Sequence, residues 1–406
     1  MYNKKELMYP DIVVFAGGAI GSPISICRNI RKVYKVNAYI ICINSLPLQS
    51  IFNKSKYVTE VFAFDGIESS SGLLKEMETW YYQMNFEQKP VLISTTDISC
   101  IYVNDFRDRY EDLFLLTFPS SKIIDVYTSK GLAEIDASEH GLTVPKSRLV
   151  SNSVDRDFIE QEFNFPVIIK PVSTRSEDKL GFKTKICDQN DFRSYANSFI
   201  KNNHHFLCQE YISGSDNSVW FYLFVRSHSG NVLDVMGVKT LQSPPGNGIM
   251  AIGETQGNLE LMRICRDFLS EIDYEGIGGL EFKYFNGKYY FIEMNIRTEA
   301  IVTVSDVTLP LSLIVYEDSI GILDAAKYNI AVENTKYIDF RPLLLARLSD
   351  KCYGFLLKDI CRIFLDKHVR LNIFYKDDWK PFAYTFVLSI IHLFGNIFNK
   401  LNMSRK

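Results

Sequence analysis

Short apolar runs alternate with longer patterned segments through the first 125 residues, and this alternation constrains the fold more than any other feature of the sequence. The apolar runs are 12–16, 38–43, 61–64, 91–94 and 113–117. The segments between them, such as 22–35 and 69–86, have helical patterning. Apolar runs of four to six residues separated by such segments are typical of βαβ units, whose parallel strands are buried under helices. We therefore expect a parallel α/β sheet in this part of the chain.

Two polar turns follow strands of this expected sheet. The first, GGAIGSP at 17–23, is a glycine-rich strand-to-helix turn, but it lacks the GxGxxG spacing of a dinucleotide site. A tight structural turn is therefore favoured over a cofactor site. The second, STTD at 94–97, follows the fourth strand. Its side chains either contact a substrate at the carboxyl ends of the strands or supply a helix N-cap, from Thr95 or Thr96.

After residue 163 the pattern changes to groups of strands, which one clear helix, 259–272, interrupts. The expected strands are 166–170, 182–187, 206–212, 219–226, 232–239, 279–284 and 289–295. Strands in antiparallel-looking groups indicate an α+β arrangement. The change in pattern predicts a domain boundary near residues 120–130.

Composition and charge exclude several classes of protein. Of the 406 residues, 47% are hydrophobic and 14% are aromatic, which excludes a disordered chain. There are 45 Lys and Arg residues against 48 Asp and Glu, a net charge of −3, so no basic surplus indicates nucleic-acid binding. The eight cysteines form no CxxC pair, and the N-terminus is polar, unlike a signal peptide. We expect reduced thiols and a cytoplasmic protein.

The segment that ends at Arg297 carries the most chemistry. An Asn-Gly pair at 286–287 lies between two strand-like stretches, which is a strong hairpin signal. Along the second strand Glu293, Asn295 and Arg297 recur with period two, so they share one face. A carboxylate, an amide oxygen and a guanidinium on one face suit a divalent cation beside a phosphate. The alternative is a surface hairpin with solvated charges.

The register of this hairpin tests whether a metal site is shared between its strands. A two-residue turn at 286–287 pairs Glu281 with Ile292, so that Glu281 and Glu293 point to opposite faces. A three-residue loop, or an equivalent bulge, pairs Glu281 with Glu293 directly. Two facing carboxylates repel each other unless a cation lies between them. A shared metal site therefore predicts the longer loop or the bulge.

A second candidate contact to phosphate is Lys170, which ends the apolar strand 166–170 and precedes a proline. A lysine at the end of a buried strand can present its ammonium group to a phosphate. The alternative is a surface lysine whose aliphatic stem lies along apolar neighbours.

Five pieces of the sequence resemble the ATP-grasp superfamily, and the resemblance covers most of residues 10–320. The pieces are YTSK at 127–130, GLTVPKS at 141–147, FPVIIKP at 165–171, QEYISG at 209–214 and the hairpin from Glu281 to Arg297. Each piece is weak alone, but five in the family's order are specific. The chain is similar to predicted ATP-dependent carboligases related to carbamoyl-phosphate synthase and biotin carboxylase.

The resemblance implies a fold with α/β and α+β parts. A Rossmann-like pre-ATP-grasp domain with a parallel sheet would occupy residues 1–125. A two-subdomain ATP-grasp domain would occupy residues 126–322, and a helical C-terminal extension would occupy residues 323–406. ATP would lie between the two subdomains together with Mg²⁺, or alternatively Mn²⁺.

The resemblance also implies the site residues. The residues expected to contact ATP are Lys130, Lys170, Ser173, Ser176, Glu210, Tyr211, Ile212 and Asp216. The residues expected to hold the metal are Glu281, Glu293 and Asn295. Arg297 and Lys239 are the expected catalytic residues, since each would neutralise charge on the transferred phosphate or on an acyl phosphate.

The reaction implied is that of an ADP-forming carboxylate–amine ligase with small-molecule substrates. A carboxylate would attack the γ-phosphate of ATP to give an acyl phosphate, and an amine or related nucleophile would displace the phosphate. A small-molecule kinase that uses the same site is one alternative, and a catalytically weak nucleotide-binding scaffold, anchored by its C-terminal helix, is another. One departure bears on the scaffold: the loop 172–181 has a single glycine, where the family has a glycine-rich loop over the phosphates. Hydroxyl groups such as those of Ser173 and Ser176 would then replace backbone donors.

The C-terminal segment 382–401 has the pattern of a helix with a wide apolar face and a narrow polar stripe. Its apolar part, 382–398, is at the lower length limit for a membrane span. Packing against the body of the protein or a partner protein is favoured. Peripheral attachment to a membrane through residues 382–401 is an alternative, and a true span is a third.

Overall fold

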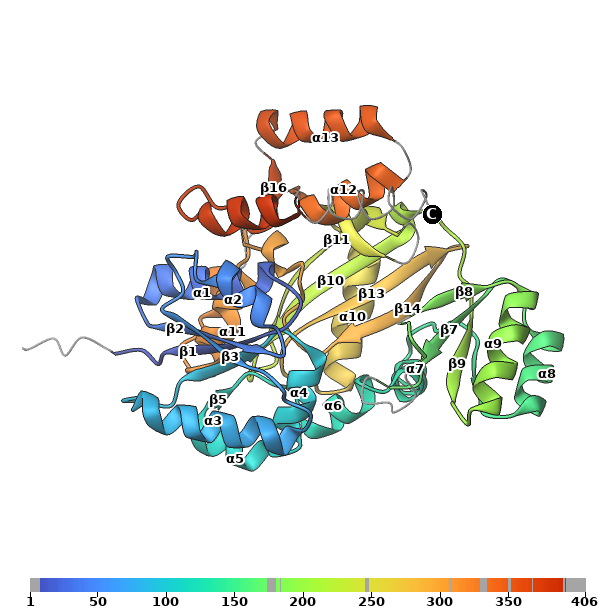
Figure 1. Ribbon diagram of the computed structural model, residues 1–406, viewed down its shortest axis with the longest axis horizontal. Helices are drawn as coiled ribbons and strands as arrows, with labels where there is room; N and C mark the ends of the chain where they lie inside the picture. Colours follow the sequence, from blue (N-terminus) through green and yellow to red (C-terminus); the bar gives the residue numbers. More distant parts are fainter. Residues whose placement is uncertain are drawn as a thin grey trace, which may run out of the picture.

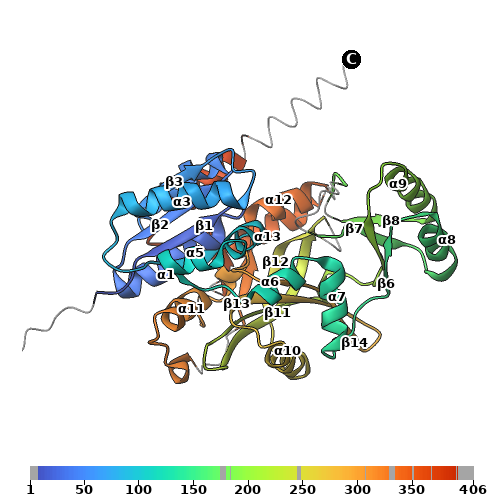
Figure 2. The ribbon, with the colours of Figure 1, turned by 90° about the horizontal axis from the view of Figure 1, so that it is seen from below.

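The computed structural model describes residues 8–173, 180–182, 184–244, 248–306, 308–328, 334–349, 352–366, 368–389 and 391 (Figure 1). Their strands form a five-stranded, a four-stranded and a seven-stranded sheet. The seven-stranded sheet lies in the middle of the molecule, with the five-stranded sheet on one side and the four-stranded sheet on the other (Figures 1 and 2).

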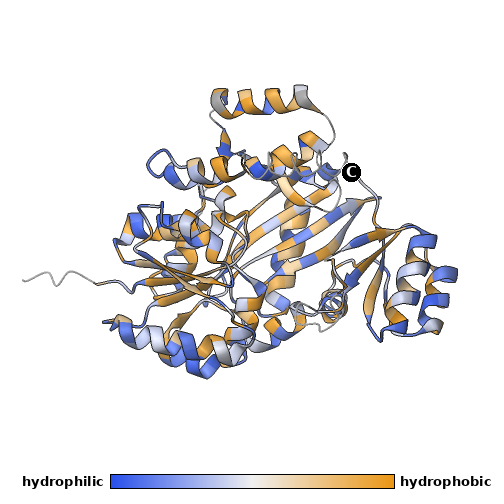
Figure 3. Cartoon of the chain, viewed as in Figure 1, coloured by the Kyte–Doolittle hydropathy of each residue, from blue (hydrophilic) through white to orange (hydrophobic). Residues whose placement is uncertain are grey.

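The five-stranded sheet is parallel, as the alternation of apolar runs predicts. Its strands are β1 (Ile12–Ala16), β2 (Ala38–Ile43), β3 (Glu60–Phe64), β4 (Val91–Ser94) and β5 (Leu115–Leu116), in the order β3-β2-β1-β4-β5. The helices of this part are α1 (Gly21–Tyr34), α2 (Leu46–Phe52), α3 (Ser70–Met84), α4 (Asp97–Asn104) and α5 (Arg107–Leu113). Every residue of β1, β2 and β4 is buried, which explains their uninterrupted apolar runs (Figure 3).

The chain turns in opposite directions from β1 and β4, and this places the turns that follow these two strands next to each other. The next strand in sequence after β1 is β2, and β2 and β4 lie on opposite sides of β1. The carboxyl ends of β1 and β4 therefore form a topological switch point. Gly18 follows β1 with a φ of 81°, which glycine adopts without strain. Thr96 follows β4 and accepts a hydrogen bond from the backbone N–H of Ser99, so it is the N-cap of α4.

The four-stranded sheet is antiparallel, and two helices that were not predicted from the sequence pack against it. Its strands are β6 (Ser147–Val150), β7 (Val167–Pro171), β8 (Lys185–Cys187) and β9 (Phe206–Glu210), in the order β6-β9-β7-β8. The helices are α8 (Ser153–Glu162) and α9 (Gln189–Lys201). The predicted helix 259–272 is confirmed as the helix Leu259–Glu271, but the expectation that it alone interrupts the strands after residue 163 was wrong, because α9 lies between β8 and β9. Phe192 and Ala196 of α9 recur at helical spacing and are buried against the sheet, and Asp188 caps the helix.

The seven-stranded sheet contains the predicted hairpin at one edge. Its strands are β14 (Lys288–Asn295), β13 (Gly276–Phe285), β10 (Val219–Arg226), β11 (Val232–Ser243), β12 (Ile249–Thr255), β15 (Lys336–Ile338) and β16 (Val369–Leu371), in this order. Helices α6 (Ser121–Tyr127) and α7 (Lys130–Glu139) connect the first sheet to the rest of the chain, and α10 (Leu259–Glu271) packs on the seven-stranded sheet (Figure 2).

The C-terminal part contributes strands as well as the expected helices. It contains α12 (Phe340–Ser349), α13 (Tyr353–Leu365) and a helix at 380–389, whereas β15 and β16 extend the seven-stranded sheet. Phe382 and Phe386 of the last helix pack against the ring of Phe340. Among the described residues, no helix combines the length and apolar character needed to cross a bilayer. Of the predicted apolar helix, residues 390 and 392–401 lie outside the described residues.

A cluster of polar side chains fastens this C-terminal part to α1. The carboxylate of Asp306 accepts hydrogen bonds from Ser25 (2.7 Å), Asn29 (2.8 Å) and Tyr375 (2.6 Å). We expect Asp306→Ala to lower the free energy of unfolding by about 2–3 kcal/mol, because partly buried donors lose their acceptor. Urea unfolding measures this change.

The control is Asp267→Ala, since Asp267 is exposed on α10. Its effect is expected to stay within about 0.5 kcal/mol. Equal stability of Asp306→Ala and Asp267→Ala would contradict the role of the Asp306 cluster.

Candidate active site

The hairpin of β13 and β14 brings two carboxylates together through a bulge. The two-residue turn at 286–287 pairs Phe285 with Lys288, the register that alone would separate the carboxylates. An irregularity after Glu281 makes Glu281 pair with Glu293, and Phe282 pair with Phe291. One residue of β14 is therefore extra, as in a β-bulge. A shared site predicted either a three-residue loop or a bulge, and the structure has the bulge and not the longer loop.

Lysines surround the two carboxylates. The Lys239 ammonium donates to Glu281 Oε1 (2.6 Å), and Lys130 Nζ lies 3.7 Å from Glu293 Oε2. Burial raises the pKa of Glu281, and Lys239 offsets only part of this effect. Burial opposes ionisation of Glu293 too, but Lys130 and Lys239 outweigh it and lower its pKa. Glu293 is therefore ionised at neutral pH.

These oxygen atoms fit a divalent cation. Glu281 and Glu293 face each other from neighbouring strands, and Asn295 lies two residues further along the face of Glu293. In the part of the chain that the structure describes, no three His, Cys, Asp or Glu side chains converge as a metal cage. A cation here would therefore be held by two carboxylates and an amide oxygen, with phosphate and water oxygens as its other ligands. Mg²⁺ accepts such a set.

Arg297 is held by a residue of α4, the helix that follows β4 of the first sheet. Its Nε donates to Asp97 Oδ1 (3.0 Å), and its Nη2 donates to Asn295 Oδ1 (2.9 Å). Asp97 is the first residue of α4, directly after the N-cap Thr96. Asp97 was not among the predicted site residues, although the segment 94–97 was expected at the carboxyl ends of the strands. The structure shows that this segment serves both as a cap and as a wall of the site.

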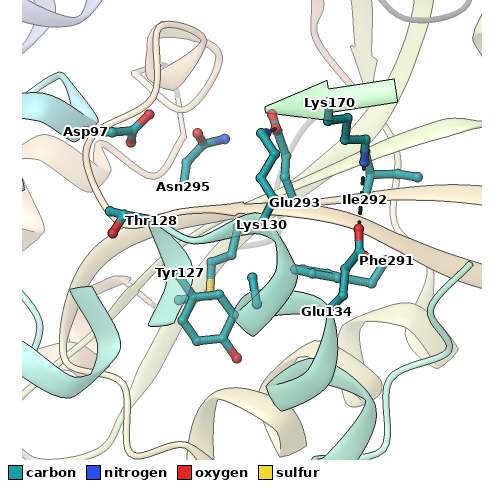
Figure 4. Close-up of a pocket in the computed structure, with 12 residues that line it drawn as sticks. Asp97, Tyr127, Thr128, Lys130, Glu134, Lys170, Phe291, Ile292, Glu293 and Asn295 are labelled. Carbon is teal, nitrogen blue, oxygen red and sulfur yellow. Dashed lines mark ion pairs between the residues drawn. The ribbon is translucent and has the colours of Figure 1, made fainter. Parts of the chain in front are cut away.

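Lys170 lines a pocket together with Lys130, Glu293 and Asn295 (Figure 4). It is 6% exposed, and its ammonium donates to Gln209 Oε1 (2.6 Å). Burial lowers its pKa to about 8, although Glu134 attracts the charge. The surface-lysine alternative is therefore wrong. The residues that line the pocket are Asp97, Tyr127, Thr128, Lys130, Ala133, Glu134, Lys170, Phe291, Ile292, Glu293, Met294 and Asn295.

Glu299 is a further acidic group that the sequence analysis missed. It is 7% exposed, and one of its oxygens, Oε1, has no hydrogen-bond partner in the described part of the chain. Burial and then repulsion by Glu281 raise its pKa to about 7. A carboxyl group with such a pKa can take up or release a proton near neutral pH. Glu299 continues the spacing of two set by Glu293, Asn295 and Arg297, and this spacing could have indicated it as a site residue.

Four of the residues expected to contact ATP, Glu210, Tyr211, Ile212 and Asp216, lie at or shortly after the end of β9. The N–H of Glu210 donates to the carbonyl of Lys146 (2.8 Å), and Ile212 is buried. The ring of Tyr211 lies 4.9 Å from Lys283 Nζ. The carboxylate of Asp216 accepts from the backbone of Gln242 (2.7 Å) and from its side chain (3.1 Å). Contact of these residues with ATP stays a prediction.

Of the two serines expected to contact the phosphates, Ser173 is among the described residues and Ser176 is not. Ser173 pairs with Ser129 in an isolated β-bridge, directly beside the start of α7. Ser176 lies outside the described residues, as does most of the loop 172–181. Four of the predicted site residues line the pocket: Lys130 from α7, Lys170 from β7, and Glu293 and Asn295 from β14.

Comparison with other proteins finds distant relatives of this chain. No family model matches the chain. Biotin carboxylase of Pseudomonas aeruginosa is 26% identical over 249 residues, which is 57% of this chain and 53% of that enzyme. The chain thus spans about half the length of this curated relative.

Solved structures share the fold over most of the chain. The ADP complex of N5-carboxyaminoimidazole ribonucleotide synthetase superposes with a TM-score of 0.64 at 12% identity, over 88% of this chain and 86% of that one. The L-amino acid ligase of Bacillus licheniformis superposes with a TM-score of 0.60 at 11% identity, over 81% and 79%. The chain is therefore similar in sequence to a biotin carboxylase and shares its fold with the synthetase and the amino acid ligase.

Proposed function

We propose that the protein is an ATP- and Mg²⁺-dependent ligase that joins a small-molecule carboxylate to an amine and releases ADP and phosphate. The observation that carries the proposal is the pair Glu281 and Glu293, brought face to face by a bulge and surrounded by Lys130, Lys239 and Arg297. The names of the similar proteins support it, since they are a biotin carboxylase, a synthetase and an amino acid ligase.

The chemistry needs positioning and charge neutralisation. Glu281, Glu293 and Asn295 would hold Mg²⁺, which supplies positive charge to the phosphates of ATP. Lys130 and Lys170 would bind the phosphate oxygens from two sides of the pocket. These residues place the γ-phosphate where a carboxylate oxygen can attack it, while the bond to the β-phosphate oxygen breaks and ADP leaves.

Arg297 and Lys239 are proposed to act on the reacting groups. Arg297 would stabilise the negative charge of the acyl phosphate, because its guanidinium is held by Asp97 and Asn295 at the edge of the pocket. Lys239 would neutralise phosphate charge beside Glu281. The amine nitrogen then attacks the acyl carbon, and the phosphate leaves with the electrons of the carbon–oxygen bond.

The larger organisation is also a proposal. Residues 1–125 would form the pre-ATP-grasp domain, residues 126–322 the catalytic domain and residues 323–406 the extension. All eight cysteines are free thiols, and six of them are buried, which supports the cytoplasm as the place where the protein acts.

The test is ADP formation with panels of carboxylates and amines. We expect ADP release from Mg²⁺-ATP only when a suitable carboxylate and amine are both present. A stable phosphorylated product without an amine would instead show a kinase. Tight ATP binding without ADP formation under every mixture would show a scaffold. Thermal-shift screening with ATP, Mg²⁺, amino acids and sugar acids selects the mixtures, since a ligand of the native state raises the unfolding temperature.

A further inference from the structure

Three buried side chains beside the pocket, Lys170, Gln209 and Glu134, contact one another in a network that we call the relay. Lys170 Nζ donates to Gln209 Oε1 (2.6 Å), and Gln209 Nε2 donates to Glu134 Oε1 (2.6 Å). Lys170 Nζ also lies 3.8 Å from Glu134 Oε1. Figure 4 shows Lys170 and Glu134 pointing toward each other from β7 and α7. The amide of Gln209 is thus oriented by an ammonium on one side and a carboxylate on the other.

The relay is almost closed to solvent. Gln209 is 1% exposed, Glu134 5% and Lys170 6%. Glu134 Oε2 has no hydrogen-bond partner among the described side chains and backbone groups, although it is buried. A carboxylate that is desolvated and incompletely bonded is costly to keep, and its position in a pocket wall indicates a role there.

The backbone fixes the helix that carries Glu134. The N–H of Lys130, the first residue of α7, donates to the carbonyl of Val172 (2.8 Å), and Ser129 pairs with Ser173. The start of α7 is therefore tied to the residues that follow β7. Glu134 lies one turn further along α7, so its carboxylate is held at a defined distance from Lys170.

We propose that Glu134 is a positioning residue for Lys170, and that through the amide of Gln209 it fixes the Lys170 ammonium at the wall of the nucleotide pocket. The inference rests on the proposed function, because it assumes that Lys170 binds the phosphates of ATP. It goes beyond that function by assigning roles to Glu134 and Gln209, two groups that would not touch the nucleotide phosphates themselves.

The relay also controls the charge of Lys170. Burial lowers the pKa of Lys170 to about 8, attraction by Glu134 raises it, repulsion by Lys130 lowers it, and Glu293 raises it. Lys130 and Glu134 face it from α7, Glu293 from β14, and the neutral Gln209 from β9. Loss of the negative charge at Glu134 therefore lowers the pKa of Lys170 further, and the ammonium is lost at a lower pH.

The experiment measures binding of MgADP by calorimetry at pH 6.0 and pH 8.5 in the full chain and in Glu134→Gln. At pH 6.0, well below the pKa of about 8 of Lys170 in the parent, we expect Glu134→Gln to bind MgADP at least as tightly as the parent, because the variant side chain carries no negative charge near the phosphates. At pH 8.5 we expect binding about tenfold weaker than in the parent, since a shift of one pKa unit changes the charged fraction by up to tenfold. This reversal is not expected of a merely structural defect, which weakens binding at both pH values.

Glu139→Gln is the matched control, because Glu139 is exposed on the same helix. It is expected to bind MgADP like the parent at both pH values. A ratio of affinities between Glu134→Gln and the parent that is the same at pH 6.0 and 8.5 would overturn the inference alone. A parent protein that binds no MgADP at either pH would overturn the proposed function and the inference together.

A second variant, Gln209→Met, tests the positioning step separately. It interrupts both hydrogen bonds but leaves the charge of Glu134 near Lys170. We expect MgADP affinity to fall at least threefold at both pH values, with no change in its pH dependence. Parent-like affinity of Gln209→Met would refute the relay, even if Glu134→Gln failed to fold.

Discussion

Glu293→Gln is expected to lower the rate of ADP formation at saturating Mg²⁺-ATP by at least about 100-fold, the loss typical of removing one group that stabilises charge in a transition state. The substitution keeps the shape of the side chain and removes its charge. The charge is present in the parent at neutral pH, because Lys130 and Lys239 hold the pKa of Glu293 below its ordinary value. Steady-state ADP release over a titration of Mg²⁺ measures the effect, and the Mg²⁺ concentration for half-maximal rate is expected to rise.

Two comparisons make this result specific. Glu271→Gln changes an exposed glutamate at the end of α10 and is expected to leave both the rate and the Mg²⁺ dependence unchanged. Glu281→Gln removes the other carboxylate and is expected to resemble Glu293→Gln. Full turnover of Glu293→Gln at the Mg²⁺ concentration that suffices for the parent would remove the basis of the metal site.

The hairpin that carries these carboxylates was predictable because its signals are local. The Asn-Gly turn at 286–287 adopts positive φ angles, 48° and 78°, which these two residue types favour. The period of two places Glu293, Asn295 and Arg297 on one face. Even the bulge followed from a local argument, since only a register irregularity could oppose Glu281 to Glu293 across a two-residue turn. The first sheet was predictable for a similar reason, because strands buried on both faces are apolar throughout.

The partners of the site residues were not predictable, because they depend on which elements pack together. Asp97 contacts Arg297 across 200 positions of sequence, and Gln209 contacts Glu134 across 75. Neither contact can be predicted from a local sequence pattern. The helix α9 was missed although its signal is local. Phe192, Ala196 and Phe199 recur at spacings of four and three and pack in the core of the four-stranded sheet.

The ion pair of Asp97 and Arg297 links α4, which follows β4 of the first sheet, to the end of the hairpin of β13 and β14. The fork of Arg297 bonds Asp97 through Nε and Asn295 through Nη2, so its plane is fixed from two elements. An ammonium group has no such fork and cannot reproduce both directions. We therefore expect Arg297→Lys to lower kcat/KM for the carboxylate substrate by about 100-fold, although the positive charge is retained. Initial rates of ADP formation at varied carboxylate concentration give kcat and KM separately.

Asp97→Asn separates orientation from charge in the same assay. It retains an oxygen acceptor for Arg297 but removes the negative charge, so it is expected to cost only about tenfold, as for a group that orients a catalytic residue. If Arg297 acts on the acyl phosphate, both variants lower kcat more than they raise KM, because that charge develops after the carboxylate has bound. An Arg297→Lys enzyme with the kcat of the parent would place Arg297 outside the reaction and leave it as a link between the two sheets.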